Sequence, residues 1–210
     1  MRKIGILGGT FNPIHKGHIA IATAAIQRLK LDEVIFMPAC IPPHKQNVSM
    51  PSGDLRAAMV EAALKDRPSF SCSRLELDKE GISYTADTLR ILFKQYGKNV
   101  LLYLLVGSDS LCYMDRWYEP EVIFRSAHIG VYCRNTEDYA SLRDYAAMLR
   151  KKYHATITIF RKSDMVEISS TELRQALAQK DEAKVKEFLP QGVLKIIREN
   201  NLYSGQKTSV

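Results

Sequence analysis

Long apolar runs are missing from this sequence of 210 residues. No stretch approaches the roughly 20 consecutive apolar residues that a membrane-spanning helix needs. The first apolar run ends at Gly8, which is too early for the apolar region of a signal peptide. These absences speak against a membrane protein, and we expect a cytoplasmic chain with no membrane partner.

Cysteine is scarce, and none of the four residues Cys40, Cys72, Cys112 and Cys133 belongs to a Cys-x-x-Cys pair. That absence leaves a zinc ribbon or a thioredoxin-like motif without support. A disulfide framework is not expected in a chain without a secretion signal. We therefore expect four reduced thiols, most of them acting as small buried hydrophobic residues.

A block of basic residues is also missing, although the formal net charge is +7. An excess of positive charge suits nucleic acid, anionic small substrates or simply solubility. Because the lysines and arginines are scattered along the chain, we expect no nucleic-acid partner. Solubility and anionic small substrates both remain open at this point.

Short apolar runs alternate with amphipathic stretches. The strand candidates are Lys3–Leu7, Glu33–Met37, Phe70–Leu77, Val100–Val106, His128–Cys133 and Thr156–Phe160. Several are continuously apolar, which is typical of strands covered on both faces in a parallel sheet. The helix candidates are His18–Lys30, Asp54–Asp66, Ala86–Tyr96, Ser108–Met114, Pro120–Arg125, Thr136–Tyr153, Ser170–Gln179, Asp181–Phe188 and Gly192–Asn200.

The alternation of strands and helices predicts an α/β domain with a Rossmann-like, doubly wound, mostly parallel sheet. We expect one domain over residues 1–203, with a small C-terminal helical part from about residue 165, and a disordered tail at 204–210. In such a sheet, ligands bind at the carboxyl ends of the strands, near the point where the strand order reverses.

A glycine-rich segment follows the first predicted strand and opens the first helix: Gly8-Gly9-Thr10-Phe11-Asn12-Pro13-Ile14-His15-Lys16-Gly17-His18. Glycines here let the backbone turn sharply and approach a ligand closely. The first turn of the helix offers unpaired N–H groups and a positive dipole end, and both favour a phosphate. An imidazole can donate to a phosphoryl oxygen, so His15 and His18 fit the same site.

Two other interpretations of this segment compete with a phosphate site. Residues three apart share a helix face, so His15 and His18 could bind a metal, but no further ligand lies close by in the sequence. Alternatively, the glycines form a plain turn and the histidines cap the helix. The segment is neither a P-loop nor a G-x-G-x-x-G fingerprint.

A second polar segment, Ile168-Ser169-Ser170-Thr171-Glu172-Leu173-Arg174, precedes a helical pattern near the C-terminus. Its hydroxyl groups are typical of a helix N-cap. Arg174 lies one turn into the helix from Ser170, and a guanidinium beside hydroxyls and free N–H groups makes an anion site. The segment is thus either a cap alone or a cap that also binds phosphate.

Together, these two segments resemble a known family. Thr10 followed by His15-Lys16-Gly17-His18 resembles the (H/T)-x-G-H phosphate motif of the nucleotidylyltransferase superfamily. The whole first segment is similar to the opening of bacterial nicotinate-nucleotide adenylyltransferases, in which the I-S-S-T-x-x-R segment holds the ATP phosphates. That family usually has Asp where this chain has Asn12, and Asn can make the same turn bonds.

Ile41-Pro42-Pro43-His44-Lys45 and Ser83-Tyr84-Thr85-Ala86-Asp87-Thr88-Leu89 resemble segments of the same family that meet its second substrate. Taken alone, the first is a rigid turn with a solvated lysine, and Thr85 in the second caps a helix. The resemblance implies instead that Lys45 meets phosphate. It also implies that the helix start at Thr85 offers N–H groups to the pyridine carboxylate, as a helix N-terminus can.

Two segments follow the most apolar strand. In Gly107-Ser108-Asp109-Ser110, Asp109 either accepts from ribose hydroxyls, as acidic residues do in dinucleotide folds, or caps a helix. Trp117 is either a core residue or a ligand platform, and its polar surroundings argue against deep burial. The resemblance implies that Trp117 stacks on the pyridine ring and that Tyr118 offers a backbone N–H.

The resemblance covers residues 2–203 and implies transfer of the adenylyl group of ATP to nicotinate mononucleotide, with Mg²⁺ bridging the triphosphate. It implies catalysis by His15, His18 and Arg174, ATP binding by Gly8, Gly9, Thr10, Phe11, Gly107, Asp109, Ile168, Ser169, Ser170 and Thr171, and acceptor binding by Lys45, Tyr84, Thr85, Trp117 and Tyr118. No metal ligands are expected from the protein, and a homo-oligomer is left open.

Other activities fit parts of the pattern. A sister transferase would use nicotinamide mononucleotide or phosphopantetheine as the acceptor. Class I aminoacyl-tRNA synthetases have a similar histidine motif, but they are usually longer and carry a lysine-rich second motif that this chain lacks. A non-catalytic nucleotide-binding regulator would bind ATP without releasing pyrophosphate. A basic nucleic-acid-binding protein would bind duplex in a strongly salt-dependent way.

Overall fold

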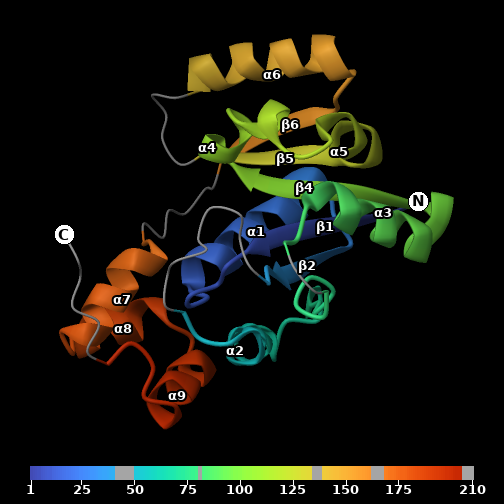
Figure 1. Ribbon diagram of the computed structural model, residues 1–210. Coiled ribbons are helices and arrows are strands. Elements are labelled where there is room, and N and C mark those ends of the chain that lie inside the picture. The colour runs from blue at the N-terminus through green and yellow to red at the C-terminus, as the bar shows by residue number, and fades with distance from the viewer. Residues whose placement is uncertain (41–49, 80–81, 134–138, 162–167, 205–210) are drawn as a thin grey trace.

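The computed structural model describes residues 1–40, 50–79, 82–133, 139–161 and 168–204. Within these ranges, six parallel strands form one sheet in the order β3-β2-β1-β4-β5-β6 (Figure 1). They are β1 (Arg2–Gly9), β2 (Glu33–Pro38), β3 (Phe70–Cys72), β4 (Val100–Gly107), β5 (His128–Cys133) and β6 (Ile157–Arg161). The doubly wound α/β fold predicted from the alternating pattern is confirmed.

Helices cover both faces of the sheet. One face packs against α1 (Lys16–Leu29) and α2 (Gly53–Leu64), and the other against α3 (Thr85–Tyr96), α5 (Pro120–Ser126) and α6 (Tyr139–Tyr153). Neighbouring residues of a strand point to opposite faces of the sheet: Leu7 packs in the core on the α1 side, and Ile6 packs in the core on the α3 side. Burial on both faces explains why these strands read as continuous apolar runs.

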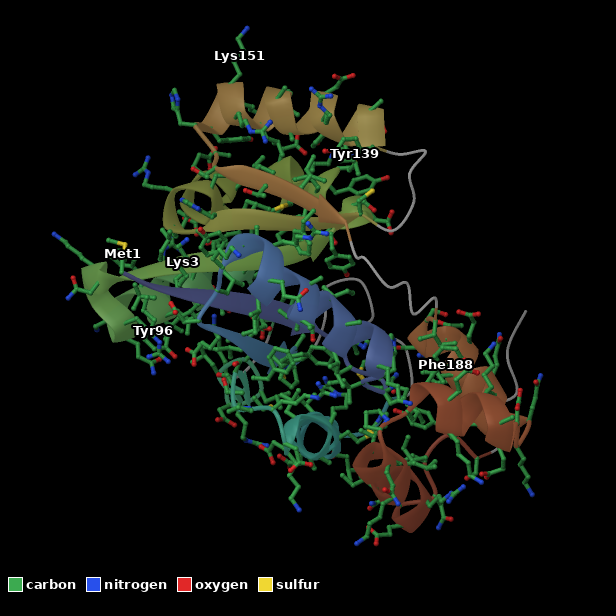
Figure 2. The ribbon with its side chains drawn as sticks, turned by 180° about the vertical axis from the view of Figure 1, so that it is seen from behind. Met1, Lys3, Tyr96, Tyr139, Lys151 and Phe188 are labelled. Carbon is green, nitrogen blue, oxygen red and sulfur yellow. The ribbon has the colours of Figure 1, made fainter. Side chains whose placement is uncertain are left out.

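Three short helices follow the last strand: α7 (Ser170–Ala178), α8 (Glu182–Phe188) and α9 (Gln191–Glu199). They join the core on the α1 side, and α9 packs against α2. In Figure 2, Phe188 of α8 lies at the opposite side of the molecule from Met1 and Tyr96. The C-terminal helices therefore gather at the carboxyl end of β1, where the first polar segment leaves the sheet.

Where the structure describes both ends, most predicted elements agree with it to within two residues, but two do not. The strand expected over Phe70–Leu77 ends at Cys72, because Leu77 and Asp78 both donate backbone hydrogen bonds to Arg74 and close a turn. The helix expected over Ser108–Met114 is split into α4 (Ser108–Leu111) and a 3₁₀ turn, Met114–Arg116. Alternating or apolar residues in these stretches pack into the core without forming one regular element.

Two other predicted segments lie partly outside the described residues. Helix α6 begins at Tyr139, and residues 136–138 of the predicted helix lie outside the described part of the chain. Ser204, the first residue of the predicted tail, belongs to a turn in which its hydroxyl donates to the Asn201 carbonyl at 2.7 Å, whereas residues 205–210 lie outside. No helix of the described residues has the length and apolar character to cross a membrane.

Candidate active site

The strand order reverses between β1 and β4. The segments that leave these two strands, Gly8–His18 and Gly107–Ser110, both begin at that point. β1 pairs with β2 on one side and with β4 on the other, with Leu7 opposite Leu105. Gly8 and Gly9 end β1, where they still pair with Met37 and Pro38 of β2, and Gly107 ends the neighbouring strand β4. Ligands of open α/β sheets bind at such a switch point, so the position of these glycines suits the nucleotide site that the sequence predicts.

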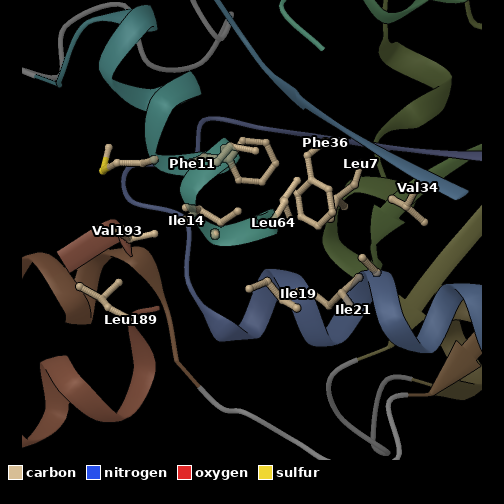
Figure 3. Close-up of a cluster of buried hydrophobic side chains, with 14 of the residues drawn as sticks. Leu7, Phe11, Ile14, Ile19, Ile21, Val34, Phe36, Leu64, Leu189 and Val193 are labelled. Carbon is tan, nitrogen blue, oxygen red and sulfur yellow. The ribbon is translucent and has the colours of Figure 1, made fainter. Parts of the chain in front are cut away.

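The chain turns sharply after β1, but the turn lies at Phe11 and not at Gly8 or Gly9, which still belong to the strand. Phe11 adopts a φ of 48°, in the left-handed region that bulky residues rarely occupy. The Phe11 ring is 2% exposed and packs 5.8 Å from the Phe36 ring, inside the core (Figure 3). The Phe11 ring therefore belongs to the core, and the backbone of Phe11 is the part that lies in the predicted phosphate segment. Gly8 is exposed, with open space where a Cβ would stand.

The two histidines lie at the N-terminus of α1, which begins at Lys16 rather than at His18 as predicted. Their ring centroids are 3.8 Å apart, and His15 is 6% exposed while His18 is half-buried. The backbone N–H of His15 donates to Nδ1 of His18 at 3.3 Å. In a neutral imidazole, an accepting Nδ1 places the proton on Nε2, so Nε2 of His18 is the donor nitrogen.

Gly17 makes this arrangement of the two histidines sterically feasible. A Cβ at Gly17 would lie 2.8 Å from Nδ1 of His15 and 3.6 Å from a side-chain methyl of Ile168. The first distance is shorter than real Cβ contacts, so any larger residue would displace the imidazole. The same contacts show that Ile168 lies beside the histidine segment.

The second polar segment is a helix cap, as its hydroxyl groups predict, and it also reaches the first segment. Ser169 caps α7 by accepting from the backbone N–H of Glu172 at 3.1 Å. The Ser170 hydroxyl donates to the Pro13 carbonyl at 3.1 Å, and Nη1 of Arg174 donates to the Asn12 carbonyl at 2.8 Å. Two segments about 160 residues apart therefore form one surface.

Two details of that surface were not predicted from the sequence. Nη2 of Arg174 contacts the exposed Thr171 hydroxyl at 3.1 Å, so the guanidinium bridges both segments. The Tyr203 hydroxyl donates to Oδ1 of Asn12 at 2.7 Å, and both side chains are buried. Burial raises the pKa of Tyr203 well above its usual range, so its hydroxyl stays protonated. Asn12 thus has a neutral donor as its partner.

Four of the residues predicted to bind the acceptor lie at the start of α3 and just before α5, on the opposite face of the sheet from α1. The rings of Tyr84 and Tyr118 lie 4.5 Å apart, and Trp117 is half-buried. Arg90 of α3 forms a two-point ion pair with Glu119, with both distances at 2.7 Å. The ring contact and the ion pair hold the start of α3 beside the segment after the 3₁₀ turn.

Thr85 is the first residue of α3 and not its N-cap, which corrects the simpler of the two interpretations. The N-cap is Tyr84, whose side chain makes no capping hydrogen bond. The first N–H groups of a helix have no partner within the helix. The helix start therefore suits an anionic ligand.

Glu76 stabilises this helix start, a role that was not predicted from the sequence. The Thr88 hydroxyl donates to Oε1 of Glu76 at 2.8 Å and approaches the Tyr84 carbonyl at 3.3 Å. The Ser83 hydroxyl donates to the Glu76 carbonyl at 3.3 Å. Burial raises the pKa of the Glu76 carboxyl, although the Thr88 hydrogen bond and Lys79 oppose the shift.

Several other predicted features can be placed. Asp109 is exposed in the first turn of α4, directly after β4. The four cysteines are free thiols, as predicted, but only Cys133 is fully buried. Burial raises the pKa of Cys72 to about 11. Lys45 lies outside the described residues. Among those that are described, no three His, Cys, Asp or Glu side chains converge on a metal position.

The comparison with known proteins agrees with this geometry. Residues 6–176 match the cytidylyltransferase-like family. A Clostridium botulinum protein is 39% identical over 203 residues, which cover 97% of this chain and 98% of the relative. A Clostridium perfringens protein is 40% identical, with the same coverage. Both are named probable nicotinate-nucleotide adenylyltransferases.

The chain belongs to the nicotinate-nucleotide adenylyltransferase family.

A solved structure agrees with this assignment at the level of the fold. The nicotinic acid mononucleotide adenylyltransferase of Plasmodium falciparum, complexed with NaAD, matches with a TM-score of 0.78 at 18% identity, over 97% of this chain and 98% of that one. The sheet order and the C-terminal helices of this family member thus follow a known arrangement. The resemblance inferred from the histidine and serine segments is confirmed.

Proposed function

We propose that this family member transfers the adenylyl group of ATP to nicotinate mononucleotide, forming nicotinate adenine dinucleotide and pyrophosphate. The observation that carries the proposal is the pair of hydrogen bonds from Ser170 and Arg174 to the Pro13 and Asn12 carbonyls. They join two anion-binding segments at the switch point of the sheet. A triphosphate needs such an extended anion site, since it carries charge over three phosphorus atoms.

The geometry supports distinct roles for the two segments. His18, with its proton on Nε2, would donate to an oxygen of the α- or β-phosphate, together with His15. Ser170, Thr171 and Arg174 would bind the departing pyrophosphate, because hydroxyls and a guanidinium match its oxygens. The backbone of Gly8, Gly9, Thr10 and Phe11, with Ile168 and Ser169, would line the phosphates, and Gly107 and Asp109 the ribose.

The acceptor would bind across β4 from the histidines. The helix start at Thr85 would meet the pyridine carboxylate, since N–H groups and the helix dipole both favour a negative charge. Trp117 would stack on the pyridine ring, with Tyr84 and Tyr118 beside it. Lys45 would meet the acceptor phosphate.

The reaction needs no covalent enzyme intermediate, because the nucleophile is already an anion. An oxygen of the mononucleotide phosphate attacks the α-phosphorus of ATP, and the bond from that phosphorus to the oxygen bridging the α- and β-phosphates breaks. The electron pair leaves with pyrophosphate. The residues then act by positioning the two substrates and by stabilising charge in the transition state.

Mg²⁺ would enter as part of the MgATP substrate. Imidazoles, hydroxyls and a guanidinium dominate the candidate site, whereas Mg²⁺ prefers carboxylate, phosphate and water oxygens. The protein residues therefore do not fit a resident Mg²⁺ site. The triphosphate itself would supply the ligands, with water in the remaining positions.

Pyrophosphate release tests the proposal. The protein is incubated with ATP and Mg²⁺, and with nicotinate mononucleotide, nicotinamide mononucleotide or phosphopantetheine in parallel. We expect strong release with nicotinate mononucleotide alone. A His18→Ala sample, purified in the same way, controls for contaminating enzymes.

The other outcomes separate the rival functions. Equal release with the amide would keep the transferase but contradict carboxylate recognition at Thr85. Release with phosphopantetheine alone would contradict the whole acceptor assignment. Tight ATP binding without release for any acceptor would indicate a non-catalytic regulator.

A further inference from the structure

Arg56 is a buried cation whose position is energetically unfavourable in three respects. It is the fourth residue of α2, near the positive end of the helix dipole, where basic residues are disfavoured. Its side chain is 2% exposed. In the part of the chain that the structure describes, no carboxylate forms an ion pair with it. Burial accordingly lowers the pKa of Arg56, although a guanidinium remains charged at neutral pH.

The Arg56 guanidinium donates instead to four backbone carbonyls. Nη1 donates to Thr10 at 2.9 Å and to Ala39 at 2.8 Å. Nη2 donates to Cys40 and Nε to Pro51, both at 3.2 Å. These carbonyls are neutral, so they satisfy the donors without cancelling the charge.

The four acceptors come from the carboxyl ends of two neighbouring strands and from the residues before α2. Thr10 follows β1, and Ala39 and Cys40 follow β2. The two strand ends also contact one another directly, because the Ala39 N–H donates to the Gly9 carbonyl at 2.9 Å. A planar guanidinium with fixed donor directions sets the relative position of all three segments, which a lysine could not do.

The Thr10 carbonyl is the most informative of these acceptors. It precedes Phe11, whose φ of 48° is costly for a bulky residue. Such a conformation persists only where the surroundings over-determine it, and strained backbone of this kind clusters at functional sites. Arg56 holds the peptide on one side of Phe11, and the buried Phe11 ring anchors the other.

We propose that Arg56 is a positioning residue for ATP: it holds the Thr10–Phe11 turn against the end of β2 and leaves a net positive charge behind the phosphate-binding backbone. The inference rests on the proposed function, which makes residues 8–11 the phosphate-facing segment. A bound triphosphate then supplies the negative charge that no carboxylate of the described residues places beside Arg56. Arg56 acts through the backbone of the turn, without touching the substrate.

The test compares Arg56→Lys and Arg56→Gln with Met59→Ala. Lysine keeps the positive charge but lacks the planar guanidinium and its fixed donor directions, and glutamine removes the charge. Met59 is fully buried on the same helix, close to Arg56 in sequence, so its truncation destabilises α2 without removing a hydrogen bond to Thr10 or Ala39. For each protein we would measure the folded fraction, the thermal midpoint, kcat and the KM for ATP and for nicotinate mononucleotide.

We expect Arg56→Lys to lose about 10- to 100-fold in kcat per folded molecule, since small misplacements of a reacting group have effects of that size. Arg56→Gln should in addition raise the KM for ATP more than the KM for the acceptor. Met59→Ala should lower the thermal midpoint but keep the kinetic constants of the wild type. That split between stability and kinetics separates positioning from a purely structural role.

Other results would overturn the proposal. Wild-type kinetic constants in Arg56→Lys would do so, as would losses that simply follow the thermal midpoint in all three variants. If neither Arg56 variant folds, Arg56 is needed for folding rather than for placing ATP. Calorimetric binding of a non-hydrolysable ATP analogue keeps the two proposals separate, because it compares the variants even if the wild type releases no pyrophosphate.

Discussion

The hydrogen bond between Tyr203 and Asn12 offers a direct test of how the C-terminal residues support the phosphate-binding turn. Tyr203 and Asn12 are 6% and 5% exposed, and the O–H···O distance of 2.7 Å is that of a well-formed bond. Tyr203→Phe removes the donor and leaves Oδ1 of Asn12 buried without it. An unsatisfied buried acceptor costs about 1–3 kcal/mol.

The expected result is a lower free energy of unfolding by that amount, measured by urea unfolding at equilibrium. In a chain of this size, about 1 kcal/mol corresponds to a fall in the thermal midpoint of about 2–4 °C. Tyr103→Phe is the matched control. Tyr103 is also buried on the α1 side, and its hydroxyl makes no hydrogen bond among the described residues.

A double-mutant cycle with Asn12→Ala isolates the pair itself. If the bond is formed, the two single changes are not additive, with an interaction energy of about 0.5–3 kcal/mol. The reasoning would be refuted if Tyr203→Phe were no more destabilising than Tyr103→Phe, or if the cycle were additive. Either result would mean that the C-terminal residues do not brace the turn through this contact.

Three further predictions follow from the site. His18→Ala should lower kcat by about 100- to 1,000-fold, the usual effect of losing one donor to developing charge, with little change in thermal midpoint; unchanged pyrophosphate release would contradict its role. Trp117→Ala should raise the KM for nicotinate mononucleotide about 2- to 10-fold, as expected for about 0.5–1.5 kcal/mol of lost ring stacking, and an equal rise in the KM for ATP would argue against stacking on the pyridine. Glu76→Gln keeps an acceptor for Thr88 and removes a half-buried charge. The raised pKa of Glu76 means that the folded chain binds the carboxyl proton more tightly than the unfolded chain does. The stability that this proton contributes is therefore complete in acid, below the ordinary carboxyl pKa, and is lost as pH rises through the raised pKa. The variant should therefore gain stability relative to the wild type at neutral pH, and a gain that is the same in acid would show that the charge is not the cause.

Features that depend on neighbours along the chain were predicted well from the sequence. The apolar runs of β1, β4 and β5, the cap at Ser169 and the start of α5 at Pro120 are local patterns, so they can be recognised without a fold. The two segments predicted to bind anions, Gly8–His18 and Ile168–Arg174, are local patterns of the same kind, because each leads into the start of a helix. Their resemblance to one family then implied that both meet the same ligand.

Predictions from local sequence patterns were wrong where tertiary packing favours a different conformation. The stretch after Phe70 alternates like a strand, yet Arg74 closes a turn there, with ion pairs to Asp54 and Asp78. Phe11 lies within a ligand-binding segment, and only the fold shows that its ring belongs to the core. At both places the local sequence is compatible with two conformations, and contacts with distant parts of the chain decide which one forms.

The supporting residues of the site were decided by the tertiary structure alone. Arg56 reaches Thr10 across 46 positions, Tyr203 reaches Asn12 across 191, and Glu76 meets Thr88 across a turn that was not predicted. Nothing in the surrounding sequence marks these side chains, because their partners are backbone carbonyls, an amide and a hydroxyl brought close by the packing of α2, α3 and the C-terminal helices. The sequence by itself predicted which residues would face the substrates. The fold determined which residues hold those segments in place, since a hydrogen bond between distant segments exists only once the segments have packed.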